Sequence, residues 1–323
     1  MDIPVVDCFA TDAAAQMRQA CMNVGFFYLK DHRIPADLLA ALYDEMQNFF
    51  TQSEAEKRKV LANANMRGYT PMNEETLDPA VQTQGDTKEG YYICREAHSD
   101  ELHLPLHGSN VFPNPLDYPS FRTVTETYFS RMSALGFHVA QLFATAAGAD
   151  GAFDGPGIPM AALRLLHYSN RKSDVGGGIF GAGAHSDYGL LTLLSTDENP
   201  GLEILHEGEW VAVPAKADCF IVNIGDLGGM LTCVAMHWTH AHAPERWTNG
   251  LFKSTRHRVV NRLGVERYSV PFFYEPNFTC QVTCLPSCVS DTNPAKYGSI
   301  TSGQHLLDKY RETHDSFDAQ ANQ

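Results

Sequence analysis

The chain has 323 residues, of which 44% are hydrophobic and 19% charged, so the composition excludes a disordered protein and favours a packed globule. The net charge of −14, with no long run of Lys and Arg to offset it, argues against a nucleic-acid partner. Neither a basic leader followed by an apolar run nor a bilayer-length apolar stretch is visible, so we expect a cytoplasmic protein without a membrane partner.

The first third of the chain predicts mixed α/β structure. Asp12 is the expected cap of the first helix, Pro35 stands where the first turn of the second begins, and the polar stretch 63–90 indicates loops. Strands are expected in IPVVDC (3–8) and GFFYLKDH (25–32), and helices over 12–24, 38–50 and 119–148.

From about residue 160 the pattern changes to short β-rich runs separated by turn residues. This spacing favours a sandwich or barrel over a parallel βαβ sheet, and residues 303–313 are again helical. The runs are ALRLLHYS, LLTLLS, LEILHEG, EWVAVPA, CFIVNIG, RHRVVN and RYSVPFFYEP.

The segment HSDYGLLTLL (185–194) places an imidazole and a carboxylate beside an apolar run. His185 and Asp187 are two residues apart, so on one strand they would project from the same face. An imidazole with a carboxylate suits Fe(II), although an isolated pair of this kind is also common in surface turns. His257, where a later β run begins, is the best third ligand, and two histidines with one carboxylate form the facial triad of non-haem iron.

A second polar pair follows in ERYSVPFF. Arg267 and Ser269 are also two apart, and a guanidinium with a hydroxyl suits the far carboxylate of a dicarboxylic acid. Taken alone, Arg267 is more simply an ordinary surface arginine.

Together these motifs resemble the Fe(II)/2-oxoglutarate-dependent dioxygenases, in the branch of isopenicillin N synthase and the plant small-molecule oxygenases. The similarity covers nearly the whole chain: GFFYLKDH, GDTKEGYYI, LRLLHYS, AHSDYGLLTLL, GLEIL, VNIGD, WTNGLFKSTRHRVV and ERYSVPFFYEPN follow in the family's order.

The resemblance implies a mainly β fold with flanking helices, in which a double-stranded β-helix (jelly roll) holds Fe(II) with His185, Asp187 and His257. Arg267 and Ser269 would bind 2-oxoglutarate, joined by Tyr168. Substrate contacts are implied for Tyr188 and Phe273, which could equally be core aromatics. We divide the chain into an N-terminal α/β region (1–110), the oxygenase core (111–300) and a C-terminal helix and tail (301–323).

The implied reaction is the oxidation of a small organic molecule, with hydroxylation the expected outcome, and release of succinate and CO2. Fe(II), 2-oxoglutarate and O2 are the implied cofactors and co-substrates, with ascorbate as an optional reductant, and a monomer is the default state. Two alternatives stay open: an oxidase of the same fold that does not use 2-oxoglutarate, and an inactive binding protein. Desaturation, demethylation and ethylene formation are not distinguished from hydroxylation by the sequence.

One segment departs from the family pattern. Residues 228–244 separate GDL from ERWTNG, where the family has only a few residues. We interpret the insert as a surface loop or as translated intron sequence; a metal-binding loop built on its histidines is a third reading.

Two other patterns have simpler explanations. Cys280, Cys284 and Cys288 lack a CxxC pair, so we expect reduced thiols in a loop or short helix in preference to a zinc site. GGGIFG (176–181) matches dinucleotide-loop spacing but leads into the HxD segment, so we expect a loop beside the metal.

Overall fold

A computed structural model describes residues 1–152, 158–227 and 247–313 of the chain. The proposed insert, 228–244, lies outside the described residues, and so does Cys233. The described strands are β1 (Val5–Asp7), β2 (Phe26–Lys30), β3 (Gly68–Thr70), β4 (Lys88–Cys94), β5 (Met160–Tyr168), β6 (Ala182–His185), β7 (Leu191–Thr196), β8 (Leu202–His206), β9 (Glu209–Ala212), β10 (Cys219–Ile224), β11 (His257–Val259), β12 (Arg267–Glu275), β13 (Gln281–Val282) and β14 (Ile300–Thr301). The helices are α1 (Ala13–Asn23), α2 (Ala36–Phe50), α3 (Glu54–Lys57), α4 (Phe121–Ala146) and α5 (Ser302–Thr313), with single 3₁₀ turns at Arg58–Val60 and Pro286–Cys288.

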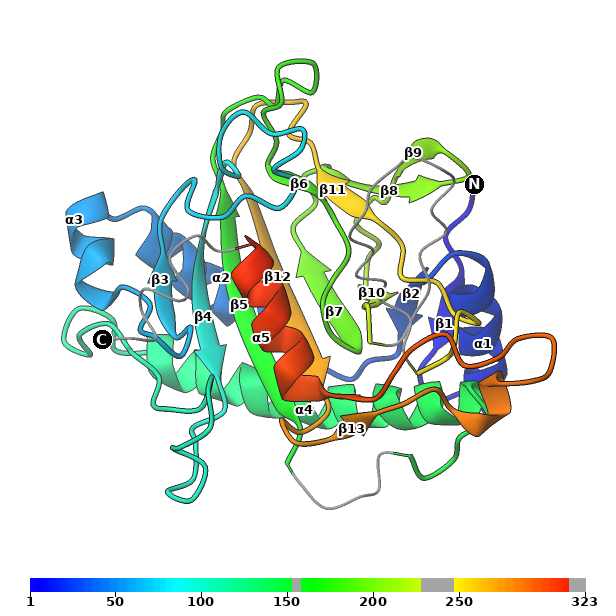
Figure 1. Cartoon of the computed structure of the whole chain (residues 1–323). Coiled ribbons are helices and arrows are strands. Elements are labelled where there is room, and N and C mark those ends of the chain that lie inside the picture. Colours follow the sequence, from blue (N-terminus) through cyan, green and yellow to red (C-terminus); the bar gives the residue numbers. More distant parts are fainter. Residues whose placement is uncertain (153–157, 228–246, 314–323) are drawn as a thin grey trace.

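Two facing sheets form the core. The larger has the strand order β1-β2-β10-β7-β12-β5-β4-β3, and the smaller has the order β6-β11-β8-β9. Helices α1, α2 and α4 pack on the outer face of the larger sheet, and α4 runs along its lower edge in Figure 1. This is the jelly-roll core with flanking helices that the sequence predicts, and the helices and strands expected from periodicity are confirmed.

Alternation along the strands of the larger sheet separates its two faces. On β5, Leu163 and Leu165 are fully buried in the core shared with the helices, whereas Leu166 and Tyr168 pack toward Val259 of the smaller sheet. Burying each large apolar side chain contributes roughly 1.5–3 kcal/mol, so the helix-covered face supplies most of the stability. The inner face combines apolar side chains such as these with the polar side chains that line the space between the sheets.

Two local predictions are wrong. Asp12 occupies the N-cap position of α1, but its side chain accepts from Gln16 Nε2 and caps no backbone amide. The stretch 63–90 is not all loop, because it contains β3 and the start of β4. Lys88 and Glu89 open β4 and are buried as ion pairs, so they do not show the apolar alternation from which a strand is recognised.

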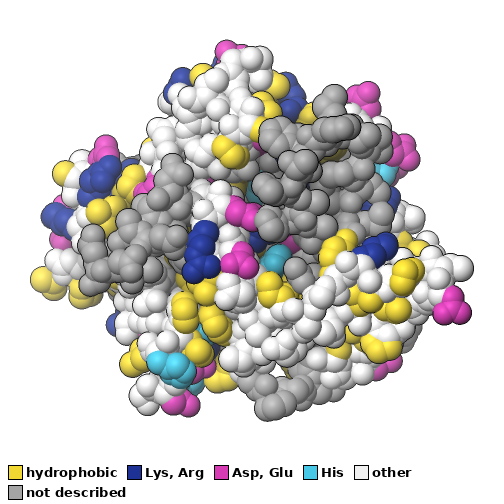
Figure 2. Space-filling model, in the orientation of Figure 1, with side chains coloured by type: hydrophobic (Ala, Val, Ile, Leu, Met, Phe, Trp, Pro, Cys, Tyr) yellow, Lys and Arg dark blue, Asp and Glu magenta, His cyan; other side chains and the backbone are white. Residues whose placement is uncertain are grey.

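Helix α5 lies in front of β5 and β12 in Figure 1, on the inner side of the larger sheet. Its Leu306 and Tyr310 line the space between the sheets. In the view of Figure 2, charged side chains and histidine gather at the centre of the face, where α5 lies. None of the helices in the described part of the chain combines the length and the apolar character needed to cross a membrane.

Candidate active site

One cavity between the two sheets is lined by all the candidate site residues that the sequence singled out. Its wall is formed by the inward faces of β4, β5 and β12 and by the ends of β6 and β11. The sequence-predicted lining residues are His185, Asp187, His257, Arg267, Ser269, Tyr168, Tyr188 and Phe273. Residues from segments far apart in the chain therefore face one common space.

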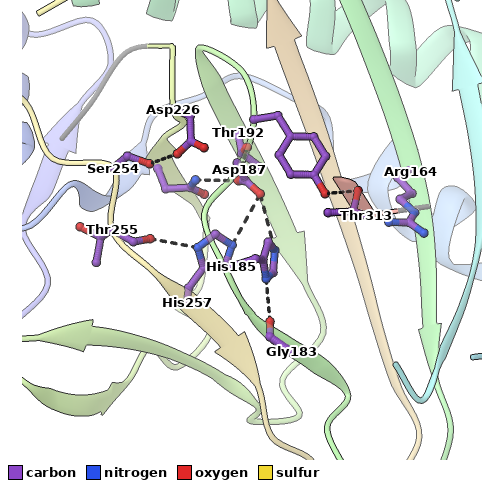
Figure 3. A network of polar contacts seen from close by, with 12 residues as sticks. Arg164, Gly183, His185, Asp187, Thr192, Asp226, Ser254, Thr255, His257 and Thr313 are labelled. Atoms are coloured by element: carbon purple, nitrogen blue, oxygen red, sulfur yellow. Dashed lines mark hydrogen bonds and ion pairs between the residues drawn. The ribbon is translucent and has the colours of Figure 1, made fainter. Parts of the chain in front are cut away.

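Three side chains converge at one end of this cavity (Figure 3). Asp187 Oδ1 lies 3.8 Å from His185 Nε2 and 3.6 Å from His257 Nε2, and one ligand atom from each residue lies within 4.8 Å of the others. Metal–ligand bonds are about 2.1 Å long, so a small contraction would bring the three ligand atoms to one metal ion. Among the described residues, these three side chains are the one group of His, Cys, Asp or Glu that lies close enough together to hold a metal ion.

Backbone carbonyls orient both imidazoles. His185 Nδ1 lies 2.8 Å from the carbonyl oxygen of Gly183, and His257 Nδ1 lies 3.1 Å from that of Thr255. A carbonyl can only accept, so each Nδ1 carries a proton, and in the neutral ring Nε2 is the nitrogen whose lone pair is available to a metal. This is the tautomer in which histidine binds a metal through Nε2.

The carboxylate of Asp187 is held from behind. Its Oδ2 accepts from Asn223 Nδ2 at 2.7 Å and from the hydroxyl of Thr192, whereas Oδ1 faces the two histidines. Both donors stand on neighbouring strands, where Asn223 of β10 pairs with Thr192 of β7. The arrangement leaves one carboxylate oxygen for a metal.

The pKa shifts of the three side chains reflect their burial and their contacts with one another. Burial, followed by repulsion from His257, lowers the pKa of His185 to about 3, so this imidazole is neutral. Burial acts to raise the pKa of Asp187, but the attraction of His257 outweighs it and the pKa is lowered. Burial opposes the charged form of His257, yet the carboxylate of Asp187 raises its pKa. A buried anion facing two imidazoles is a donor set that suits a divalent cation such as Fe(II).

Arg267 lies elsewhere on the cavity wall, at the beginning of β12, and is 3% exposed. Its Nε donates to the carbonyl of Asn199 at 3.1 Å and its Nη2 to Thr196 Oγ1 at 2.6 Å. Its buried Nη1 has no hydrogen-bond partner among the described residues. An orphaned guanidinium N–H facing a cavity fits a carboxylate ligand, because a buried unsatisfied donor is otherwise costly.

Ser269 and Tyr168 adjoin Arg267. In the β5–β12 register, Arg267 pairs with Tyr168 and Ser269 with Leu166. The Arg267 guanidinium carbon lies 5.1 Å from the centre of the Tyr168 ring, so the ring packs against the cation. Phe273 lies farther along the same face of β12, opposite Thr192.

The expectation that His185 and Asp187 project from one strand is wrong. His185 and Asp187 do not open one strand together: His185 is the last residue of β6, and Asp187 lies in the connection to β7. His257 is the first residue of β11 and pairs with His185, as expected from its place at the start of a β run. The metal ligands therefore come from two paired strands and the turn that follows one of them.

The residues that hold Asp187 are not apparent from sequence reasoning. Asp226 donates its backbone amide to the carbonyl of Asp187 at 2.7 Å, and its Oδ1 accepts from Ser254 Oγ at 2.8 Å (Figure 3). Burial raises the pKa of Asp226 to about 6 despite the nearby Lys309. Asn223 and Asp226 both lie in VNIGD, so that motif is the signal that could have identified them.

Comparison with known proteins agrees with this geometry. Residues 3–115 match the model of the non-haem dioxygenase in morphine synthesis N-terminal family, and residues 160–276 match that of the 2OG-Fe(II) oxygenase superfamily. The chain is 32% identical over 312 residues to kihadalactone A synthase LFS of Citrus sinensis, covering 93% of this chain and 88% of that protein. It is 32% identical over 332 residues to the 2-oxoglutarate-Fe(II) type oxidoreductase hxnY of Emericella nidulans, covering 96% and 90%.

Solved structures show the same similarity. A full-length Neurospora crassa protein, solved in complex with alpha-KG and thymine, superposes with a TM-score of 0.79 at 27% identity, over 96% of both chains. A 2OG-Fe(II) oxygenase family protein of Caulobacter crescentus superposes with a TM-score of 0.77 at 29% identity, over 96% of this chain and 98% of that one.

Proposed function

The chain belongs to the 2OG-Fe(II) oxygenase superfamily, and we propose from this premise that His185, Asp187 and His257 are its iron ligands. It is a 2-oxoglutarate-dependent oxidoreductase that uses Fe(II) and acts on a small molecule. The observation that carries the residue assignment is the convergence of His185 Nε2, Asp187 Oδ1 and His257 Nε2 in the cavity that also contains the unpartnered Nη1 of Arg267.

Each side chain has a distinct part in this proposal. The two histidines would hold Fe(II) through their Nε2 atoms and Asp187 through Oδ1. Arg267 Nη1 and the Ser269 hydroxyl bind the C5 carboxylate of 2-oxoglutarate, while Tyr168 packs against the guanidinium and keeps it in place. Bound Fe(II) supplies the oxidising chemistry, in which 2-oxoglutarate and O2 give succinate, CO2 and the oxidised substrate.

The substrate occupies the remaining part of the cavity. Tyr188 and Phe273 line it together with Leu306 and Tyr310 of α5, so its wall is rich in aromatic and aliphatic surface. Such walls exclude water from the reacting atoms, which suppresses side reactions. We propose hydroxylation as the outcome, a monomer as the working unit, and no nucleic-acid partner, because the chain carries a net charge of −14.

The experiment that tests the assignment is an anaerobic titration of the Fe(II)-loaded protein with 2-oxoglutarate. Chelation of iron by the keto-acid end gives a weak visible charge-transfer band. We expect this band in the wild type and its loss in His257→Ala. His103→Ala, which removes an exposed histidine, is the matched control and keeps the band. A folded wild-type protein without the band, or a His257→Ala protein that retains it, contradicts the assignment.

A further inference from the structure

The connection between β3 and β4, residues 71–87, contacts both strands that carry the histidine ligands. Asp86 Oδ1 accepts from the backbone amide of Gly183 in β6 at 2.9 Å. Arg256 precedes His257, and its Nη2 donates to the carbonyl of Ala184 at 2.8 Å and to Asp78 Oδ2 at 3.3 Å. The N-terminal part of the chain is thus attached to the backbone on which the metal ligands stand.

Asp86 is the most deeply buried of these contacts, with 0% of its surface exposed. Its Oδ1 accepts from Gly183 N and from Gln82 Nε2, the latter at 2.8 Å, and its Oδ2 pairs with Lys88 Nζ. Burial of a carboxylate is costly unless it is paired and hydrogen-bonded, and both oxygens of Asp86 are satisfied. The Asp86 carboxylate is therefore held in one orientation, so it can in turn hold the Gly183 amide in place.

Gly183 is the residue through which Asp86 reaches the metal centre. Its amide donates to Asp86, and its carbonyl accepts from His185 Nδ1 at 2.8 Å, so it stands between the carboxylate and the imidazole. Glycine has the widest backbone freedom of any residue and no side chain to pack in place. Residues on both sides of Gly183 in β6 pair with β11 across an irregularity in register, and Asp86 adds a hydrogen bond from outside that sheet to the peptide next to the carbonyl that orients His185.

We propose that Asp86 is a positioning residue of the metal centre, acting through Gly183 on the orientation of the His185 imidazole. This inference rests on the proposed function, because it takes His185 as an iron ligand. It assigns to the N-terminal segment a part in metal binding in addition to its place in the larger sheet.

A chain of buried ion pairs connects Asp86 to the cavity wall. Lys88, 4% exposed, lies between Asp86 and Glu75, with its Nζ 2.8 Å from Glu75 Oε2. The same Glu75 oxygen accepts from Arg164 Nη1 at 2.9 Å, and Arg164 and Glu75 line the cavity. The positions of Asp86 and of the cavity wall are consequently fixed together.

Two double variants that differ only at the proposed contact test the inference. In Asp86→Asn/Lys88→Met, the amide oxygen still accepts from Gly183 N; in Asp86→Ala/Lys88→Met, no acceptor remains. Replacing Lys88 in both removes the cation that would otherwise be left unpaired. Asp174→Ala is the control, because Asp174 accepts from a backbone amide in the segment before β6 but does not touch Gly183.

The full-length proteins are loaded with Co(II) in place of Fe(II), and two quantities are measured: the Co(II) dissociation constant and the proton NMR signals of the ligand imidazole N–H groups. These signals are strongly shifted by Co(II) and exchange with solvent, and a His185→Ala protein assigns them. We expect the alanine double variant to lose or rapidly exchange the His185 signal while the His257 signal persists. Its Co(II) affinity falls by about tenfold, the lower end of the range for groups that orient metal ligands. The asparagine double variant and Asp174→Ala keep both signals.

A uniform loosening of the fold would alter both histidine signals equally, and that result overturns the proposal. So does an alanine double variant that keeps both signals and the affinity of its asparagine partner. A wild-type protein that shows neither signal on Co(II) loading contradicts the iron-site assignment itself, and with it the role of Asp86.

Discussion

The side-chain amide of Asn223 is hydrogen-bonded to Asp187: its Nδ2 lies 2.7 Å from Asp187 Oδ2, the oxygen that does not face the histidines. Asn223 is 2% exposed and belongs to β10, a strand of the larger sheet, whereas the histidines stand on the smaller sheet. The Asp187 carboxylate is therefore hydrogen-bonded by a residue of the larger sheet while it faces two histidines of the smaller sheet. By fixing the plane of the Asp187 carboxylate, Asn223 keeps Oδ1 directed toward the two histidines.

Asn223→Leu is expected to weaken Fe(II) binding by roughly ten- to a hundredfold, because the Asp187 carboxylate then keeps one of its two orienting donors and is held less firmly. The measurement is an anaerobic Fe(II) titration with thermal unfolding of the metal-free protein recorded in parallel. Leucine has the same branched shape as asparagine and suits a buried position, so we expect the fold to be retained, which the unfolding measurement checks. Wild-type Fe(II) affinity in this variant would remove the orienting role from Asn223.

Thr192 gives the matched test of the second donor to the same oxygen. Thr192→Val removes the hydroxyl with little change of shape, and Thr192→Ser keeps it. We expect Fe(II) affinity to fall in the valine variant and to stay within about threefold of wild type in the serine variant. Equal losses in both would indicate that the methyl group, and not the hydroxyl, is what the site needs.

Whether a feature of the site can be predicted from the sequence depends on how far apart in the chain the interacting residues lie. The triad can be proposed from the sequence because its residue types match a known pattern, and the pair Arg267 and Ser269 can be proposed because strand alternation is local. Asn223 and Asp86 each contact the site through one hydrogen bond to a residue distant in the chain. Nothing in the local pattern of apolar and polar residues marks either of them. Strand β4 was partly missed for the same reason, because Lys88 and Glu89 are buried only by virtue of remote partners.

Arg267→Lys is expected to raise the KM for 2-oxoglutarate by more than tenfold without changing Fe(II) affinity. Lysine keeps the charge but not the planar fork, whose Nε and Nη2 are bound to Asn199 and Thr196 while Nη1 faces the cavity. Hydrogen bonds to charged groups contribute about 1.5–3 kcal/mol, which corresponds to more than a tenfold change. Steady-state turnover by succinate release and an independent Fe(II) titration separate the two effects.

Arg131→Lys, which changes an exposed arginine of α4, serves as the control for Arg267→Lys and should leave both quantities unaltered. A normal KM in the Arg267→Lys protein would mean that any cation suffices for the carboxylate. A parallel loss of Fe(II) binding would mean that the arginine supports the metal site as a whole.

Gly189→Ala is expected to destabilise the protein by about 1–3 kcal/mol, the usual cost of overpacking a core. A Cβ at this position would overlap the carboxylate of Glu275, and Glu275 cannot easily move because its Oε2 accepts from Leu190 N at 2.9 Å. Urea unfolding gives the free-energy difference. Gly298→Ala is the control, because a Cβ there meets no atom within 4 Å.

Coupling between Gly189 and Glu275 can be tested directly. If the clash is the cause, Glu275→Ala makes room, and the double variant Gly189→Ala/Glu275→Ala is more stable than the sum of the two single effects predicts. Simple additivity would show that alanine at position 189 acts through the backbone and not through Glu275.

Tyr188→Phe is expected to loosen α5 while leaving 2-oxoglutarate binding intact. The Tyr188 hydroxyl donates to Thr313 Oγ1 at 2.8 Å, and its carbonyl oxygen lies 2.9 Å from His305 Nε2, so this residue holds both ends of the helix. Removing the hydroxyl leaves only one of these contacts. A hydrogen bond contributes about 1 kcal/mol, so amide hydrogen exchange in the last turn of α5 should accelerate about fivefold.

The comparison variants locate the effect on the Tyr188–Thr313 contact. Thr313→Val removes the partner hydroxyl and should accelerate exchange to the same degree, whereas Thr127→Val, on α4, removes a hydroxyl bonded only within its own helix and should not. Because the Tyr188 hydroxyl contacts Thr313 and not Arg267, the KM for 2-oxoglutarate should stay within about twofold of wild type. If exchange in α5 is unchanged in both contact variants, the Tyr188 hydroxyl does not hold the last turn of the helix, and the other contacts of α5, among them Lys309 with Asp226, are sufficient.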